Sequence, residues 1–290
     1  MLHAEPETDA GTDPAELHTL VRQHGTGSLP AELVTRLHDE RTATRDPFLV
    51  DYLDGVLSGS GGQLQMLLLE RVRSAAALSA EDMATLLVAD VVADERGGAR
   101  AEPAGNRRRV RHALRFVAVA TGTPLADTDP PAFPAGPAEP WFERTATAAD
   151  GDEFALVRVL QAREMLFTVL ADDVRAATLA VRDGRVAEAG ELVAHATTMF
   201  DRAAMLSRVI TIPLAGDVRS ERYERFAAAC GPLGRRLGEA RPDTLAATVA
   251  AHPDSELLPA LDLLDEARRR WADRLAADAA RVAAPEADAA

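Results

Sequence analysis

The chain contains no lysine, so all 32 of its basic residues are arginine. Without a lysine amine, this chain cannot form a Schiff base with a carbonyl substrate. Cys230 is its single cysteine, which excludes an intrachain disulfide and a metal site built from several thiolates. Aromatic residues make up only 4% of the sequence, so each tryptophan and tyrosine is a position of interest.

Long apolar runs are also missing. No stretch approaches the roughly 18–20 apolar residues that a membrane-spanning helix needs. The N-terminus, MLHAEPETDAGTDPAE, is acidic and lacks the basic-then-apolar order of a signal peptide. We therefore expect a soluble, cytoplasmic protein without a membrane partner.

Acidic residues outnumber basic ones, and the net charge at pH 7 is −14. A general nucleic-acid-binding protein needs a basic footprint, so we expect no nucleic-acid partner. The chain has 290 residues, of which 47% are hydrophobic and 27% charged. This composition is typical of a globular chain with one large or two modest domains.

Apolar residues recur at helical spacing along most of the chain, and no stretch shows a convincing strand-like alternation. We therefore predict an all-α fold, a helical bundle. Composition divides the chain into five parts: a disordered N-terminus (1–14), an N-terminal helical region (15–120), a Pro-rich linker (121–140), a helical core (141–280) and a disordered tail (281–290).

Several helix starts carry capping residues. Ser28 is an expected N-cap, and Ser79 followed by Asp82 resembles a capping box. Asp243 is expected to cap a short helix near the C-terminus. The last long helix is expected to begin at Asp254 or Ser255.

Residues 152–175, DEFALVRVLQAREMLFTVLADDVR, predict one long helix with charged residues on its apolar strip. Asp152–Glu153, Gln161, Glu164 and Met165–Leu166 follow the spacing D-E-x-x-x-F-x-x-x-H-Q-x-x-E-L-W. This stretch resembles the tryptophan 2,3-dioxygenase family, which has such a helix.

Two later segments extend the resemblance. Tyr223 to Phe226 stand where the family has an F-x-x-F-R segment, and 264–275 (LDEARRRWADRL) is similar to its last helix, which carries W-x-x-x-H. The similarity covers roughly residues 145–280, about half of the chain. It implies the family's all-α bundle with extra N-terminal helices, an aromatic amino-acid or indole substrate, and a homo-oligomer, a dimer or tetramer.

The positions that carry the family's oxygen chemistry differ here. Leu275 stands at the position of the heme-ligating histidine, and Leu160 and Leu156 stand at those of the distal histidine and phenylalanine. Ala227 replaces the arginine that pairs with the substrate carboxylate. The resemblance therefore implies a divergent member that does not bind heme in the family's way, and we expect no cofactor.

Glu153, Leu156, Leu160 and Glu164 are spaced so that they share one helical face. A carboxylate in an apolar pocket has a raised pKa and can act as a general acid or base near neutral pH. Glu153 and Glu164 are therefore candidate catalytic residues, with Leu156 and Leu160 lining the substrate pocket. Alternatively, Glu153 pairs at the helix start and Glu164 bridges to a neighbouring arginine.

Other candidates lie on the same core helices. His195 is a candidate general base or replacement heme ligand, or else a hydrogen-bonded structural histidine. Arg163 and Arg202 are candidate anchors for a substrate carboxylate, or else salt-bridge partners. Tyr223 is expected to orient an aromatic acid, or else to make a helix–helix contact. No set of residues has metal-ligand spacing, so no metal is expected.

Residues 107–120, RRRVRHALRFVAVA, place arginines among apolar positions. They predict either an amphipathic helix with a solvated arginine face or an anion-binding face for a carboxylate or phosphate. The neighbouring arginines are expected to lower the pKa of His112.

Three functions are compatible with these features. The first is a heme-free enzyme of secondary metabolism that condenses or cyclises an aromatic amino acid or indole by acid–base catalysis, as in a Pictet–Spengler reaction. The second is a heme-dependent oxygenase or hydroxylase of tryptophan or tyrosine, with His195 or His112 as the axial ligand. The third is a non-catalytic binding protein or partner subunit.

Overall fold

The computed structural model describes residues 13–24, 29–58, 64–97, 103–147, 151–210, 220–231, 243–252 and 257–287. The regular structure in these ranges is helical throughout, without a strand, which confirms the predicted all-α class. No helix among the described residues combines the length and the apolar character that crossing a membrane requires.

The chain forms two compact units. Unit 1 comprises Met1–Leu78 and Phe133–Val157, and unit 2 comprises Ser79–Ala132 and Arg158–Ala290. This division differs from the domain boundaries expected from composition, because the segment around Trp141 groups with the N-terminal helices and not with the core that follows it.

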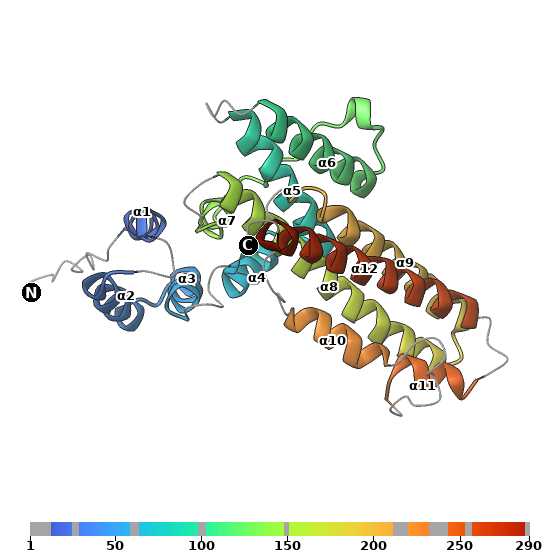
Figure 1. The fold of residues 1–290 in the computed structure, drawn as a ribbon. Helices are drawn as coiled ribbons and strands as arrows, with labels where there is room; N and C mark the ends of the chain where they lie inside the picture. Colours follow the sequence, from blue (N-terminus) through green and yellow to red (C-terminus); the bar gives the residue numbers. More distant parts are fainter. Residues whose placement is uncertain are drawn as a thin grey trace, which may run out of the picture. The chain divides into compact units, whose positions relative to one another are not determined.

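The described residues of unit 1 include the short helices α1 (Pro14–His24), α2 (Ala31–Ala43), α3 (Pro47–Leu57), α4 (Met66–Ala75) and α7 (Glu139–Arg144) (Figure 1). Aromatic packing accounts for the place of α7. The rings of Trp141 and Phe48 stack at 5.6 Å, and Tyr52 lies 6.5 Å from Trp141. Phe133 and Phe142 stack at 4.5 Å within the returning segment. Ring contacts of this kind favour a fixed docking of the segment on α3.

The described residues of unit 2 form α5 (Ala80–Gly97), α6 (Pro103–Thr121), a 3₁₀ turn η2 (Leu125–Asp127), α8 (Gly151–Arg182, of which residues 158–182 belong to this unit), α9 (Val186–Leu206), α10 (Glu221–Cys230), α11 (Leu245–Ala250) and α12 (Leu258–Ala287). Figure 1 shows α12 alongside α9, and α5 packs against α6. The bundle centre is aromatic, with Phe167, Phe200, Phe226 and Trp271 all buried.

A buried charge fixes α8 to α5. The side chain of Arg158 is only 1% exposed, and its Nε donates to Asp90 Oδ2 at 2.7 Å. Its Nη1 donates to Gln161 Oε1 at 3.1 Å. A buried guanidinium is tolerated only when it is paired, so α8 and α5 must pack in this register.

The expected helix caps are confirmed in one case and corrected in another. The Ser79 hydroxyl accepts from the Asp82 amide at 3.0 Å, as expected. The cap of α11 is Thr244 and not Asp243, because the Thr244 hydroxyl reaches the Ala247 amide at 3.3 Å. Ser28 and residues 253–255 lie outside the described residues.

The last helix is longer than expected. The backbone of α12 stays helical to Ala287, past residue 281, where the disordered tail was expected to begin. Alanine has the highest helix propensity, and this Ala-rich segment continues the helix despite its polar composition.

Gly231 and Gly184 provide a matched stability test. Both have positive φ, +76° and +75°, but a Cβ at Gly231 would lie 2.7 Å from Thr244 Oγ1, whereas one at Gly184 would meet nothing within 4 Å. We expect Gly231→Ala to lower the free energy of unfolding by about 1–3 kcal/mol more than Gly184→Ala, because only the former adds overpacking to backbone strain. Urea denaturation of both variants measures this, and equal losses would contradict the close contact at Thr244.

Candidate functional site

The predicted strip on α8 grows more buried along the helix. Glu153 is exposed in the first turn, Leu156 is half-buried, and Leu160 and Glu164 are buried. Glu153 and Leu156 belong to unit 1, whereas Leu160 and Glu164 belong to unit 2. An acidic residue in a first helical turn interacts favourably with the helix dipole, which gives Glu153 a structural role.

Glu164 lies in a buried polar network. Its Oε2 accepts from the Ser220 hydroxyl at 2.6 Å, and its Oε1 accepts from Arg163 Nη2 at 3.4 Å. The same Ser220 oxygen accepts from the Tyr223 amide at 3.0 Å and so caps α10. Glu164 therefore ties the start of α10 to α8 and makes the arginine bridge expected as its alternative role. Its acid–base role stays a prediction.

Arg163 and Tyr223 surround this network with aromatic contacts. The Arg163 guanidinium lies 5.9 Å from the Phe167 ring centre, and burial lowers the pKa of Arg163. Tyr223 packs 4.8 Å from Trp271 and 5.4 Å from Phe167. Both residues are thus engaged with other side chains of unit 2. The arrangement is a packed helix seam, and the substrate roles expected for Arg163 and Tyr223 stay predictions.

A second polar cluster surrounds His195. Its Nδ1 hydrogen-bonds to Asp173 Oδ2 at 2.7 Å, and its Nε2 lies 3.4 Å from Glu81 Oε2. Arg202 donates to the other oxygen of Glu81. Burial raises the pKa of Asp173, against the opposing effect of the hydrogen bond from His195. The cluster joins α5, α8 and α9.

The His195 cluster has a geometry that suits proton transfer. Its imidazole is 43% exposed, whereas the Asp173 carboxylate is only 12% exposed. A carboxylate that holds one ring nitrogen orients the imidazole for proton transfer at the other. Arg202, expected to anchor a substrate carboxylate, instead pairs with Glu81 of this chain.

The expectation that heme is not bound in the family's way stays a prediction, and the structure places the residues on which it rests as follows. Leu275 stands on α12 four residues after Trp271, and leucine has no lone pair for iron. Leu160 is buried and apolar. Both ring nitrogens of His195 face carboxylates.

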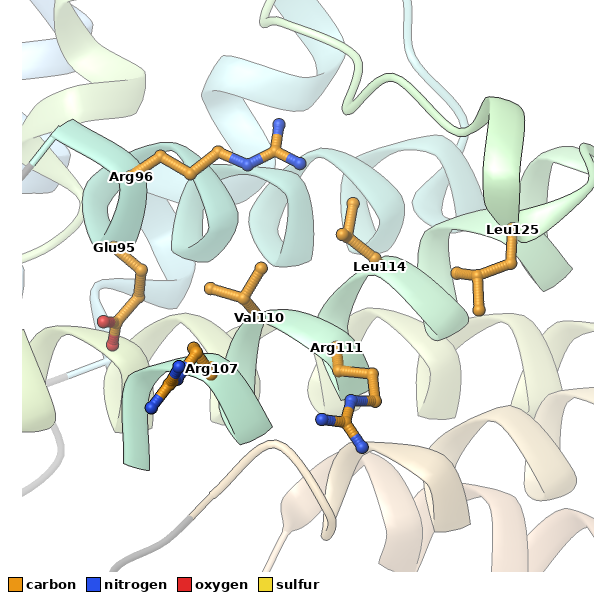
Figure 2. Close-up of a pocket in the computed structure, with 7 residues that line it drawn as sticks. All are labelled: Glu95, Arg96, Arg107, Val110, Arg111, Leu114 and Leu125. Atoms are coloured by element: carbon orange, nitrogen blue, oxygen red, sulfur yellow. The ribbon is translucent and has the colours of Figure 1, made fainter. Parts of the chain in front are cut away.

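The third feature is a cavity of about 420 Å³ in unit 2 between α5, α6 and η2 (Figure 2). Figure 2 shows the Arg96 side chain on α5 on the same side as Val110 and Leu114 of α6, with Leu125 beyond Leu114, whereas the Arg111 side chain points away from Arg96. The full lining comprises three arginines, one glutamate and three aliphatic residues: Arg96, Arg107, Arg111, Glu95, Val110, Leu114 and Leu125.

Some charged residues that line this cavity have ion-pair partners, and others have none among the described residues. Glu95 pairs with Arg109, and the two side chains are 5% and 4% exposed. Arg96 and Arg111 are exposed, and within the part of the chain that the structure describes they take part in no ion pair or hydrogen bond. Leu125 is 48% exposed at the apolar side. The cavity therefore combines guanidinium groups with an aliphatic surface.

The cavity and the His195 cluster are separate sites. Glu81 of the cluster and Glu95 of the cavity lie on the same helix, α5. At 1.5 Å per residue they are roughly 21 Å apart along its axis. One small molecule cannot occupy both places.

Sequence reasoning identified some of these residues and missed others. The arginines among apolar positions on α6 marked this segment, which lines the cavity, as a candidate anion-binding face, and that role stays a prediction. Asp173 and Glu81 were missed, since only the packing of α5, α8 and α9 brings them to His195. Ser220 was missed as well, although a serine before a helix is an N-cap signal. The sequence around Arg96 did not indicate a binding role, because an arginine at a charged helix end is common.

Comparison with known proteins gives no assignment. Neither a protein-family model, nor a curated protein, nor a solved structure matches this chain. The resemblance to the tryptophan 2,3-dioxygenase family stays a prediction, and function must be argued from the geometry.

His112 on α6 supplies a pH-dependent test of the basic surface. Burial, together with Arg108, Arg208 and other arginines, lowers the pKa of His112 below its usual 6.5. The unfolded chain therefore takes up this proton at a higher pH than the folded chain, and stability falls as the pH falls below about 6.5. We expect His112→Gln to lose less thermal stability than the wild type between about pH 7.5 and pH 5.

Melting temperatures across this range test the expectation. His38→Gln, at an exposed histidine on α2, is the control and should follow the wild type. A His112→Gln profile parallel to the wild-type profile would contradict the role of the arginines.

Proposed function

We propose that unit 2 binds a small organic anion with an apolar body in the cavity between α5 and α6. One observation carries the proposal. The guanidinium groups of Arg96 and Arg111, which pair with no other described residue, line the same cavity as the aliphatic side chains of Val110, Leu114 and Leu125.

The size and chemistry of the cavity support this class of ligand. A volume of about 420 Å³ lies within the roughly 300–1,000 Å³ of small-molecule sites. Arginine recognises carboxylates and phosphates through two parallel N–H donors. An aromatic acid of one or two rings satisfies both requirements, and such acids include the substrate class that the sequence resemblance implies. The proposal develops the third of the functions expected from the sequence.

Arg111 and Arg115 offer a matched test of this binding. Both are exposed arginines one turn apart on α6, but only Arg111 lines the cavity. We expect indole-3-acetate to bind the wild type, Arg111→Ala to weaken binding by about tenfold, the value of one charge-assisted contact, and Arg115→Ala to change it little. Isothermal titration calorimetry measures all three affinities.

Two outcomes would refute the proposal. One is that no aromatic or aliphatic acid in a panel binds the wild-type protein. The other is that Arg111→Ala and Arg115→Ala weaken binding equally, since that would show a diffuse effect of charge and not a site.

A second candidate function is acid–base catalysis at His195. The observation that favours it is the 2.7 Å hydrogen bond between His195 Nδ1 and Asp173 Oδ2, in which the His195 side chain stays 43% exposed. A histidine held in this way suits the heme-free condensation or cyclisation of an aromatic amino acid expected from the sequence. Its substrate would lie at the Glu81 end of α5, away from the cavity.

Incubation of the protein with tryptophan and an aldehyde tests this second function. Mass spectrometry should detect a cyclised condensation product, and His195→Gln should slow its formation by at least about 100-fold, a usual contribution of a general base. His252→Gln is the control, because the described partner of the His252 ring is the Thr248 carbonyl and not a carboxylate. Product formed equally by His195→Gln would remove this candidate, and a Soret band lost in that variant would support the heme alternative instead.

A further inference from the structure

A row of basic residues follows one face of α6. Positions three, four and seven apart lie on the same side of a helix, and at this spacing α6 carries Arg108, Arg111, His112 and Arg115. The three arginines are exposed, and His112 between them is half-buried. The row is therefore a continuous basic strip on the surface of unit 2.

A further arginine joins this row from a second helix. Arg208 stands two residues after the end of α9, it is exposed, and α9 packs against α6. Burial lowers the pKa of His112, and Arg208 and the three arginines of the row lower it further. Since an exposed charge acts only over a short distance in water, all four arginines lie near the His112 ring. These five residues are called the arginine stripe: Arg108, Arg111, His112, Arg115 and Arg208.

The arginine stripe and the cavity occupy different faces of α6. Successive residues of a helix are about 100° apart, which places the cavity residues Arg107, Val110 and Leu114 about a quarter turn around α6 from the stripe. Arg111 stands at the border of the two faces. Figure 2 shows its side chain pointing away from Arg96. A ligand of the stripe thus does not occupy the cavity.

The charge of the arginine stripe is not neutralised within the part of the chain that the structure describes. None of its four guanidinium groups makes an ion pair or a hydrogen bond there. Elsewhere in unit 2, arginines such as Arg158 and Arg202 pair with carboxylates. Like charges held side by side on a helix repel one another and destabilise it. An anion with several charges removes this repulsion when it binds.

The exposure of the stripe determines the kind of anion that it can hold. A single ion pair at an exposed position contributes little, because water and salt screen it. Several contacts made by one molecule reinforce one another, since the later contacts form within an existing complex. Arginine also recognises a phosphate through two parallel N–H donors. A ligand with several phosphates in a row therefore suits the stripe better than a monocarboxylate.

The length of the stripe and the charge of the chain limit the size of this ligand. Arg108 and Arg115 are seven residues apart, which is about 10 Å along the helix axis. A chain of two or three phosphates has a comparable length. A nucleic acid or an anionic membrane would extend past the stripe and face a chain of net charge −14, and this repulsion opposes binding. These observations favour a compact ligand.

We propose that the arginine stripe binds a compact oligophosphate, the phosphate chain of inorganic tripolyphosphate or of a nucleoside triphosphate. The phosphate chain lies along α6 from Arg108 to Arg115, and Arg208 contacts it from the side of α9. This site goes beyond the proposed binding of an organic anion in the cavity, with which it shares Arg111.

Calorimetric titrations of the full chain without divalent cations test the class of ligand. At about pH 8, where the second phosphate ionisation is complete, tripolyphosphate should bind at least about tenfold more tightly than orthophosphate. Citrate, a compact tricarboxylate, should bind less tightly than tripolyphosphate, because it spans less of the stripe. ATP separates the two sources. Tighter binding of ATP than of tripolyphosphate identifies a nucleotide as the ligand, and equal or weaker binding identifies the inorganic chain.

Matched arginine variants test the location of the site. Arg108→Ala and Arg115→Ala should each weaken tripolyphosphate binding several-fold, and the double variant should weaken it by at least about tenfold. Arg96→Ala removes the same charge from an exposed position of α5 and should change it little. Indole-3-acetate should show the reverse pattern, since Arg96 lines the cavity whereas Arg108 and Arg115 do not. Circular dichroism verifies that these exposed-site variants are folded.

Three results would overturn this inference. The first is that tripolyphosphate binds no more tightly than orthophosphate or citrate. The second is that Arg96→Ala weakens tripolyphosphate binding as much as Arg108→Ala and Arg115→Ala do, which would show a general effect of charge. The third is that a single-stranded oligonucleotide or an anionic vesicle binds more tightly than tripolyphosphate and loses its affinity in the double variant, which would assign the stripe to a larger polyanion.

The two ligands keep this inference distinct from the proposed function of the cavity. If indole-3-acetate and the other organic acids fail to bind while tripolyphosphate binds at the stripe, only the cavity proposal fails. If the organic acids bind and tripolyphosphate does not, only the stripe proposal fails.

Discussion

Helix α8 is fixed to three neighbouring helices by three polar links, and the architecture of unit 2 depends on them. Arg158 pairs with Asp90 of α5, Glu164 accepts from Ser220 at the start of α10, and Asp173 bonds His195 of α9. Each of these side chains of α8 is largely buried. A buried charge without its partner is strongly destabilising, so each link excludes sliding or rotation of the helix.

These links explain why charge shares the apolar strip of α8. In the sequence, acidic and basic residues on a buried face suggest catalysis. In the structure, Glu164 and Arg163 are held by each other and by α10, whereas His195 keeps an exposed edge. The polar residues of α8 thus contribute to packing between helices, and their catalytic and substrate-binding roles stay predictions.

Local features were predictable from the sequence, and distant contacts were not. The Ser79 cap needs only Asp82, three residues away, and was found. The aromatic contacts of Trp141 with Phe48 and Tyr52 join segments that are far apart in the sequence, so composition alone did not reveal them. Asp173 and His195 lie on consecutive helices, yet their meeting depends on the rotation of both helices, which periodicity alone leaves open. The part of the cavity lining on α6 was recognisable in the sequence, where arginines alternate with aliphatic residues. Arg96 and Leu125 could not be assigned to it, because tertiary packing brings them there.

The absence of lysine has a last consequence at the cavity between α5 and α6. All of its cationic lining residues are guanidinium groups, which remain protonated up to a pH of about 12. The lone carboxylate there is buried in an ion pair with Arg109. The electrostatic character of the cavity is therefore constant from the protein's side across the physiological range. A pH dependence of the proposed anion binding would therefore come from titration of the anion and of His112, the neighbour of Arg111 on α6.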